Sequence, residues 1–185
     1  MLLGKAYITK NDLQKMKKWE TLEAVERHPD KVNWSTLSGN EYIPFEFFER
    51  HLDKIDWYNL SQNTRIPVEF FEKHLDKVDW ETLSCNNMPI EFFERHMDKV
   101  DWESLSCNEN LPVEFFEKHL DKVDWYWLSM NENIPAEFFC RHLDKVNWWN
   151  LSKNENIPFE FFEKHFDKIK LGKLPISKYI GLAET

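Results

Sequence analysis

Large apolar residues recur along this chain with a period of about 23 residues. Each copy of the period begins with a tryptophan, has a leucine three residues later, and continues to a Pro-x-Glu-Phe-Phe segment and a histidine. The tryptophans that open the copies, called frame tryptophans below, are Trp34, Trp57, Trp80, Trp102, Trp125 and Trp148. A fixed period of this kind marks a tandem repeat, in which each copy is one structural unit that packs against its neighbours.

The Pro-x-Glu-Phe-Phe segment predicts an α-helix in every copy. In the copy that begins at Trp57, Pro67 fits the first turn of a helix, where its missing N–H costs nothing. We expect this helix to continue through Leu75. Its apolar face then carries two pairs of residues four apart, Phe70 with His74 and Phe71 with Leu75, and its polar face carries an ion pair between Glu69 and Lys73.

A second, shorter helix is predicted at each frame tryptophan. Aspartate or asparagine precedes every one of these tryptophans, and both are good N-cap residues. In one copy Asp79 is this cap, and Trp80, Leu83 and Ser84 share one face over little more than a turn, which suits either an α or a 3₁₀ helix. Asn86, which has an equivalent in every copy, is typical of a turn.

The repeat also predicts the domain organisation. Two short helices in about 23 residues cannot bury a core alone, but stacked copies can, by interleaving their Trp, Leu and Phe side chains. We therefore predict an all-α solenoid with six two-helix copies over residues 34–170, a helical cap with a half repeat over 1–33, and a C-terminal cap or tail over 171–185. The copy that begins at Trp80 is one residue short in its CNNMP segment, which is therefore predicted to be a loop.

The repeat resembles short tandem repeats in proteins of large DNA viruses that infect amoebae and algae, in particular marseillevirus-like viruses. The viral repeats often read W-x-x-L-S-x-N-P-N-A-I-x-L-L-x-x-N-P-D-K-I-x-W, and the matching residues in one copy are Trp57, Leu60, Ser61, Asn63, Asp76, Lys77 and Val78. This chain departs from the pattern by Ile-Pro in place of N-P-N-A-I and by histidine in place of the second asparagine. The alternation of helices is also similar to that of leucine-rich-repeat-variant solenoids. The resemblance covers about residues 27–170 and implies a viral repeat protein, but it implies no activity and no catalytic residue.

The composition indicates which class of partner the protein binds and where in the cell it is located. The chain has 24 basic and 33 acidic residues, a formal net charge of −9, whereas a nucleic-acid-binding face must be basic. Its apolar runs are too short to span a bilayer, and its first residues lack a signal-peptide pattern. Three cysteines form no disulfide framework. We therefore expect an intracellular protein of the host cytoplasm or nucleus during infection, or a virion component, but not a secreted protein.

The histidines suggest a metal or catalytic site, but their repetition argues against both. All seven histidines of the chain keep the repeat frame. Packed helices are about 8–10 Å apart, which is too far for in-register histidines to share a zinc ion with bonds of about 2.0–2.1 Å. A catalytic group belongs to one constellation in one pocket, not to a series along an array. We expect neutral, hydrogen-bonded histidines, with no metal, no cofactor and no enzymatic activity. A secondary hypothesis is that they charge near pH 5–6 and loosen the array.

The two positions after each frame tryptophan vary from copy to copy and are the candidate binding positions. They read ST, YN, ET, ES, YW and WN, and they point away from the Trp–Leu face of the short helix. The aromatic residues among them are Tyr58, Tyr126, Trp127 and Trp149, which we predict to be exposed and to contact a partner. The alternative is that they pack on neighbouring copies or on the C-terminal cap.

The sequence thus predicts a non-enzymatic scaffold or adapter, monomeric or weakly self-associating. Its partner would be a host or viral protein, and charge complementarity favours a basic one. One alternative is a structural virion component that self-associates through an end or an edge of the array. Another is a single-stranded nucleic-acid binder that stacks bases on its aromatic residues, for which the basic KHFDKIKLGKLPISK segment speaks and the net charge does not.

Overall fold

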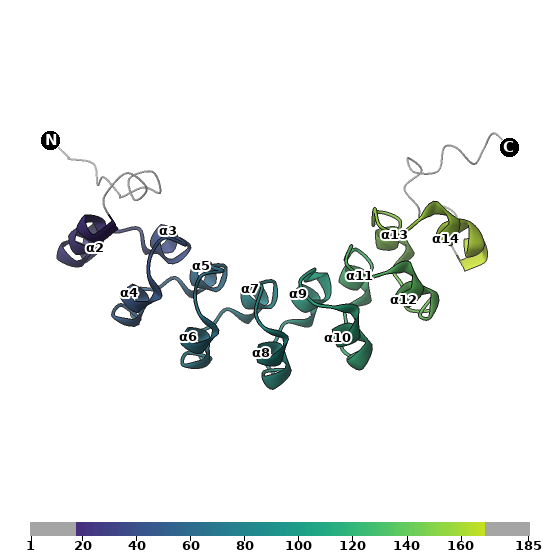
Figure 1. The fold of residues 1–185 in the computed structure, drawn as a ribbon, viewed down its shortest axis with the longest axis horizontal. Helices are drawn as coiled ribbons and strands as arrows, with labels where there is room; N and C mark the ends of the chain where they lie inside the picture. Colours follow the sequence, from purple (N-terminus) through teal and green to yellow (C-terminus); the bar gives the residue numbers. More distant parts are fainter. Residues whose placement is uncertain (1–17, 169–185) are drawn as a thin grey trace. The chain divides into compact units, whose positions relative to one another are not determined.

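The structure confirms the predicted all-α repeat solenoid. The computed structural model describes residues 18–168, and over this range it contains thirteen short α-helices, two 3₁₀ helices and no strand (Figure 1). The C-terminal cap predicted over 171–185 and the first half of the cap predicted over 1–33 lie outside the described residues.

The helices belong to two compact units, Met1–Asn86 and Asn87–Thr185, which we call the N-terminal unit and the C-terminal unit. The division falls inside the CNNMP segment of the copy that is one residue short. The described helices of the N-terminal unit are α2 (Lys18–Arg27), η1 (Pro29–Lys31), α3 (Trp34–Ser38), α4 (Phe45–Glu49), α5 (Trp57–Ser61), α6 (Val68–Glu72) and α7 (Trp80–Ser84). Those of the C-terminal unit are α8 (Ile90–Arg95), α9 (Trp102–Cys107), α10 (Val113–Lys118), α11 (Trp125–Leu128), α12 (Ala136–Cys140), α13 (Trp148–Leu151), α14 (Phe159–Lys164) and η2 (Phe166–Lys168).

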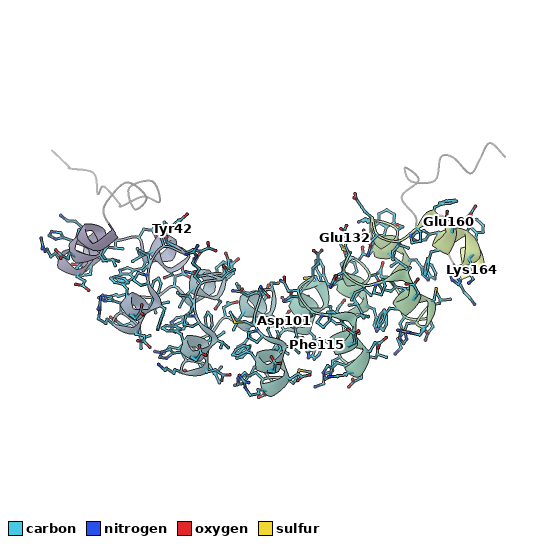
Figure 2. All side chains as sticks on the ribbon, in the orientation of Figure 1. Tyr42, Asp101, Phe115, Glu132, Glu160 and Lys164 are labelled. Atoms are coloured by element: carbon cyan, nitrogen blue, oxygen red, sulfur yellow. The ribbon has the colours of Figure 1, made fainter. Side chains whose placement is uncertain are left out.

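Each unit consists of two layers of helices with a continuous apolar core between them. In the N-terminal unit, α3, α5 and α7 form one layer and α4 and α6 the other (Figure 1). In the C-terminal unit, α9, α11 and α13 face α8, α10, α12 and α14 in the same way (Figure 1). The Phe pair of each copy and the leucine after each frame tryptophan are buried, among them Phe115, which is labelled in Figure 2.

The Pro-x-Glu-Phe-Phe helices are shorter than the sequence predicts at both ends. Pro67 has extended backbone angles, φ −67° and ψ 148°, and is the N-cap of α6, which therefore begins at Val68 and not at the proline. The helix ends at Glu72 instead of Leu75, because the chain turns at His74, whose N–H donates to the Phe71 carbonyl oxygen at 2.9 Å. The predicted apolar contact survives without the helix, since the rings of Phe70 and His74 have centroids 4.9 Å apart.

The predicted caps of the tryptophan helices are confirmed. An Asp or Asn side chain accepts a hydrogen bond from a backbone N–H of the first turn in all six copies, as Asp56 does from the Asn59 N–H at 3.0 Å. The helices are α-helices of four to six residues. Partial burial acts to raise the pKa of Asp56, but hydrogen bonds from Asn59, Ser35 and the Tyr58 N–H outweigh it and hold the pKa below its usual value.

The frame tryptophans are half-buried and do not lie in the core as the sequence predicts. The Trp57 ring stacks on Phe70 with centroids 6.0 Å apart, and the His74 ring lies 5.6 Å away. The Lys77 ammonium lies 6.0 Å from the Trp57 centroid, a cation–π arrangement. The same arrangement recurs at Trp102 and Trp125. The tryptophan thus closes the edge of the core, and the lysine stem covers the part of its ring that the core leaves open.

The recurring asparagine joins neighbouring copies in addition to forming its predicted turn. The Asn131 side-chain oxygen accepts from the Asn133 N–H at 2.9 Å, which is the turn. Its amide group donates to the carbonyl oxygens of Ser106 and Asn108 in the preceding copy, at 3.1 and 3.3 Å. Asn63 and Asn154 make equivalent bonds to the preceding copy, whereas the buried amide nitrogen of Asn40, in the first copy, has no partner within residues 18–168.

Ion pairs also run between copies, although α2 holds one within the helix, between Arg27 and Glu23 at 3.0 Å. Lys73 lies 3.2 Å from Glu49 of the preceding copy, and no ion pair joins it to Glu69. The reason is that α6 ends at Glu72, so Lys73 is the C-cap and turns toward the neighbouring helix. Three further pairs have the same separation of 24 residues: Arg50 with Glu26, Lys118 with Glu94, and Arg141 with Glu117.

Candidate protein-interaction surface

The first residue after each frame tryptophan is exposed and forms a row on one layer of each unit. The N-cap fixes where the helix begins. The frame tryptophan and the leucine three residues later face the other layer. The residue directly after the tryptophan therefore faces solvent. We call these residues the first-position row. In the N-terminal unit the row is Ser35, Tyr58 and Glu81, and in the C-terminal unit it is Glu103, Tyr126 and Trp149.

Three of the four aromatic residues singled out from the sequence belong to this row, and their predicted exposure is confirmed. Tyr58 is 56% exposed, Tyr126 48% and Trp149 40%. Their contact with a partner stays a prediction.

The exposure predicted for Trp127, at the second position after a frame tryptophan, is wrong. Trp127 is half-buried and meets Tyr126 edge to face, with centroids 5.2 Å apart and an interplanar angle of 79°. Asn150, at the same position one copy later, is fully buried. One further residue rotates the side chain by about 100° around the helix axis, which carries it from the solvent face to the side of the helix.

Tyr126 and Trp149 lie on consecutive helices of one layer, α11 and α13 (Figure 1). The Asn150 side-chain amide donates to the Tyr126 carbonyl oxygen at 2.8 Å, so α13 is tied to α11 at the residue beside Trp149. The Asn150 N–H in turn donates to the Asn147 cap at 3.0 Å. Two exposed aromatic side chains therefore project from consecutive helices that a hydrogen bond joins.

Residues in the turns that follow α11 and α13 are also exposed next to the two aromatic residues in sequence, and sequence reasoning missed them. Met130, four residues after Tyr126, is 37% exposed. Lys153, four residues after Trp149, places its ammonium 4.9 Å from the Trp149 ring centroid. Each of these two residues lies four positions after a variable aromatic residue, which is the sequence feature that could have identified them. The prediction was confined to the two positions after each frame tryptophan.

Most of the charged residues named next, which are on or close in sequence to the helices that carry the two aromatic residues, are acidic. Glu103 occupies the first-position row one copy before Tyr126 and is exposed. Glu132 and Glu155 are exposed in the turns that follow α11 and α13, and Glu132 is labelled in Figure 2. Lys153 supplies a positive charge at the Trp149 end. The row thus has an acidic end at Glu103 and a basic side chain at the opposite end.

The N-terminal unit has exposed aromatic residues without aromatic neighbours in its row. Tyr58 stands between Ser35 and Glu81. Tyr42, which is 57% exposed and was not singled out from the sequence, lies in a turn, with the Arg65 guanidinium 5.9 Å from its ring centroid. These residues do not form a pair like that of Tyr126 and Trp149.

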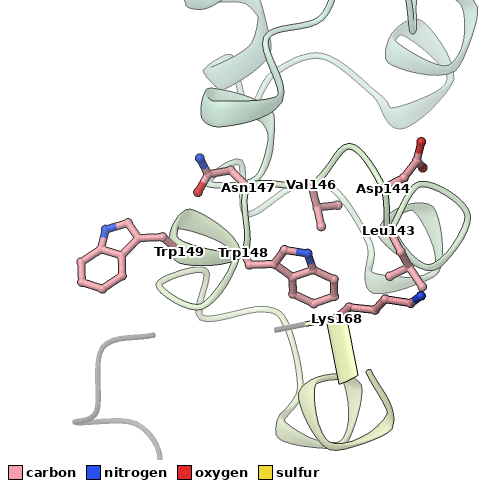
Figure 3. Close-up of a pocket in the computed structure, with 7 residues that line it drawn as sticks. All are labelled: Leu143, Asp144, Val146, Asn147, Trp148, Trp149 and Lys168. Atoms are coloured by element: carbon pink, nitrogen blue, oxygen red, sulfur yellow. The ribbon is translucent and has the colours of Figure 1, made fainter. Parts of the chain in front are cut away.

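A cavity of about 440 Å³ lies beside the last frame tryptophan in the C-terminal unit. The Trp148 ring points into it, opposite Lys168, whereas the Trp149 ring points the other way (Figure 3). Its walls are Leu143, Asp144, Val146, Asn147, Trp148, Trp149 and Lys168. Lys168 is the last described residue, and we assign the cavity no ligand.

The histidines pack against aromatic rings, and the hydrogen bonds predicted for them are not general. His119 lies 5.6 Å from the Trp102 centroid and 5.1 Å from Phe115, and its Nε2 is buried without a partner within residues 18–168. Burial, followed by the nearby charge of Lys122, lowers the pKa of His119. The pKa values of His74 and His142 are lowered in the same way, by burial first and then by the lysine three residues later.

Metal-ligating side chains do not converge in the described residues. Between residues 18 and 168, no three His, Cys, Asp or Glu side chains are placed to hold a metal ion. The Cys140 sulfur lies 3.8 Å from the His165 Nε2, which is a pair and not a cluster. None of the three cysteines forms a disulfide.

Comparisons with known proteins leave the chain's family open. No protein-family model, curated protein or solved structure matches this chain. The resemblance to viral repeats therefore stays a prediction. Over the described range, every helix is too short or too polar to cross a membrane.

Proposed function

We propose that this protein is a non-enzymatic scaffold or adapter that binds another protein through the surface around Tyr126 and Trp149. The observation that carries the proposal is that two exposed aromatic side chains project from consecutive helices of one layer, α11 and α13, which the hydrogen bond from the Asn150 side chain to Tyr126 joins. Tyrosine and tryptophan are enriched among residues that dominate protein–protein binding energy, because they supply a large contact area with few rotatable bonds. Met130 adds an adaptable apolar contact beside them.

The charge of the surface supports a basic protein as the partner. Glu103 precedes Tyr126 in the first-position row, and Glu132 and Glu155 are exposed in the turns after α11 and α13. Complementary charge raises association rates and excludes acidic competitors. The same charge disfavours phosphate backbones, which need lysine and arginine neighbours. Together with the resemblance in sequence, this supports a viral adapter that acts in the infected cell or in the particle.

The proposal is tested by capture followed by a binding measurement on the purified partner. The full-length protein, immobilised, is exposed to host lysate and to virion extract, and a captured protein is purified and titrated by calorimetry. The matched variants are Tyr126→Ala with Trp149→Ala, and Tyr58→Ala as the control, with circular dichroism to show that each is folded. We expect the double variant to weaken binding by at least about tenfold and Tyr58→Ala to leave it unchanged.

Two outcomes would overturn the proposal. If only copies of the chain itself are captured and light scattering shows concentration-dependent assembly, the protein is a self-associating structural component. If single-stranded RNA or DNA binds with a strong salt dependence, and the double variant no longer binds it, the surface is a nucleic-acid-binding site.

A further inference from the structure

The side chains of the first-position row of the C-terminal unit follow an order that could match a single bound segment. Three consecutive copies present a carboxylate, a phenol and an indole, as Glu103, Tyr126 and Trp149 on α9, α11 and α13. All three are exposed, and Lys153 covers part of the Trp149 ring at the far end. A single partner segment that runs along the row would meet one acidic and two aromatic contacts in sequence.

The spacing of the row selects the conformation of that segment. Neighbouring packed helices are generally about 8–10 Å apart, and we expect about that separation between consecutive members of the row, which occupy the same position on consecutive helices. A polyproline II helix rises about 3.1 Å per residue with three residues per turn, so it presents every third side chain on one face at about 9 Å. A β-strand alternates its side chains with a period of two, so residues three apart point to opposite faces.

An α-helix also places residues on one face at a comparable distance, about 10.5 Å for seven residues, but it fits this surface less well. Its carbonyl oxygens are satisfied internally, whereas a polyproline II chain has no internal hydrogen bonds. The Tyr126 hydroxyl and the Trp149 indole N–H are donors on the exposed face, suited to carbonyl oxygens that lack a partner. Aromatic faces that border exposed donors are the general means of holding proline rings.

We propose that the first-position row of the C-terminal unit binds a polyproline II segment of the partner protein with the pattern basic-x-x-Pro-x-x-Pro. The basic side chain pairs with Glu103, and the two prolines pack on Tyr126 and Trp149. Lys153 repels a basic residue at the Trp149 end and so fixes which end of the segment lies at Glu103. This inference rests on the proposed protein-binding function and specifies the class of partner at the same surface.

The test is a calorimetric titration of the full chain with end-blocked peptides. The probe has the sequence KPAPPAP, and the control KPAAPAA lacks the two prolines that the row would hold. We expect KPAPPAP to bind and KPAAPAA to bind at least about tenfold more weakly. Tyr126→Ala and Trp149→Ala should each weaken the binding of KPAPPAP by a similar factor, while the matched control Tyr58→Ala should not.

A charge exchange tests the orientation independently of the aromatic residues. Glu103→Lys should weaken KPAPPAP and strengthen EPAPPAP, whereas the matched control Glu81→Lys in the N-terminal unit should change neither. Equal binding of KPAPPAP and KPAAPAA, binding that Trp149→Ala leaves intact, or no binding of KPAPPAP at millimolar concentration would overturn the inference.

The outcome also separates this inference from the proposed function. If a captured partner needs Tyr126 and Trp149 but binds through a helical segment, the protein-binding function stands and the polyproline inference is wrong. If the captured partner binds equally well to the variant that lacks both aromatic side chains, the proposed function itself fails.

Discussion

The two units are built from the same repeat, yet they present different surfaces. The row of the N-terminal unit holds one tyrosine, Tyr58, between a serine and a glutamate, and the row of the C-terminal unit holds Tyr126 beside Trp149. Tyr58 is the more exposed of the two tyrosines, at 56% against 48%. Exposure alone therefore does not set the proposed binding residue Tyr126 apart from Tyr58. The two tyrosines differ in the next residue of their row, which is Glu81 after Tyr58 and Trp149 after Tyr126.

The comparison shows how a repeat separates folding from recognition. In both units the caps, the phenylalanine pairs and the asparagine bonds between copies recur, because each copy must pack on the next. The side chains of the first-position row lie outside these contacts except that of Ser35, whose hydroxyl oxygen accepts from the Asn59 amide of the next copy at 2.8 Å. The residues at the other positions of the row can change without loss of these contacts. The N-terminal unit consequently serves as an internal control for the C-terminal unit, and the predictions below use it in that way.

The largest expected effect comes from removing a buried phenylalanine. Phe138→Ala deletes a fully buried ring that contacts Trp125 and His142, and we expect a loss of about 3–5 kcal/mol in the free energy of unfolding. Phe70→Ala in the N-terminal unit should cost a similar amount, since Phe70 is 1% exposed. Hydrogen exchange should show each loss mainly in its own unit. A loss of protection spread evenly over both units would contradict their treatment as separate compact units.

The asparagine bonds between copies should matter less than the core, and unequally along the chain. Asn131→Ala removes two bonds to the preceding copy and one turn bond, for which we expect a loss of about 2–3 kcal/mol in the free energy of unfolding. Asn40→Ala should cost only about 1 kcal/mol, because Asn40 makes its turn bond to the Tyr42 N–H but has no partner for its amide nitrogen within residues 18–168. Urea denaturation measures both, and equal losses would refute the role assigned to the bonds between copies.

Acid should destabilise the protein through its histidines, and the C-terminal unit more than the N-terminal unit. The pKa values of His119 and His142, like that of His74, are lowered in the folded state, so the unfolded chain binds more protons as pH falls. Stability is then complete above the unfolded pKa of 6.5 and declines as pH falls from there through the lower folded values.

Urea midpoints at pH 7.5, 6.5 and 5.5 test this dependence. We expect His119→Gln with His142→Gln to reduce the pH dependence more than His74→Gln does. A midpoint that does not change between pH 7.5 and 5 would show that histidine protonation has no effect on folding.

The smallest expected effect concerns the exposed ion pairs between copies. Cys140 stands where Glu49 stands in an earlier copy, and Glu49 pairs with Lys73 at 3.2 Å. Cys140→Glu should allow an equivalent pair with Lys164 and stabilise the C-terminal unit by at most about 1 kcal/mol, while Glu49→Gln should destabilise the N-terminal unit by a similar amount. Thermal unfolding at low and high salt checks both, because the two effects should shrink together as salt screens the charges.

Local features of this protein were predictable from sequence, and contacts between copies were not. The period, the two helices and the Asp56 cap each depend on residues a few positions apart, so the pattern contains them. The end of α6 at Glu72 depends on a turn that carries the chain to the next copy, and that turn also redirects Lys73 from Glu69 to Glu49. Such partners lie 24 residues away, and their register is fixed only by the stacking.

The candidate surface was predictable in part for the same reason. The solvent face of Tyr58, Tyr126 and Trp149 follows from the helix that the N-cap begins. The half-buried position of Trp127 does not follow from the start of the helix alone, since Thr36, at the same position of the first copy, is exposed.

A transplant of the row tests the central claim most directly. In a Trp149→Ala background, Ser35→Glu and Glu81→Trp would give the N-terminal unit the order carboxylate, tyrosine, indole around Tyr58. The measurement is the calorimetric affinity of the captured partner for the wild type, for Trp149→Ala, and for the transplanted chain, all shown to be folded by circular dichroism. The account predicts that Trp149→Ala weakens binding by at least about tenfold and that the transplant restores most of it. Full binding by Trp149→Ala alone, or a folded transplant that remains as weak as Trp149→Ala, would contradict the claim that the aromatic pair makes the site.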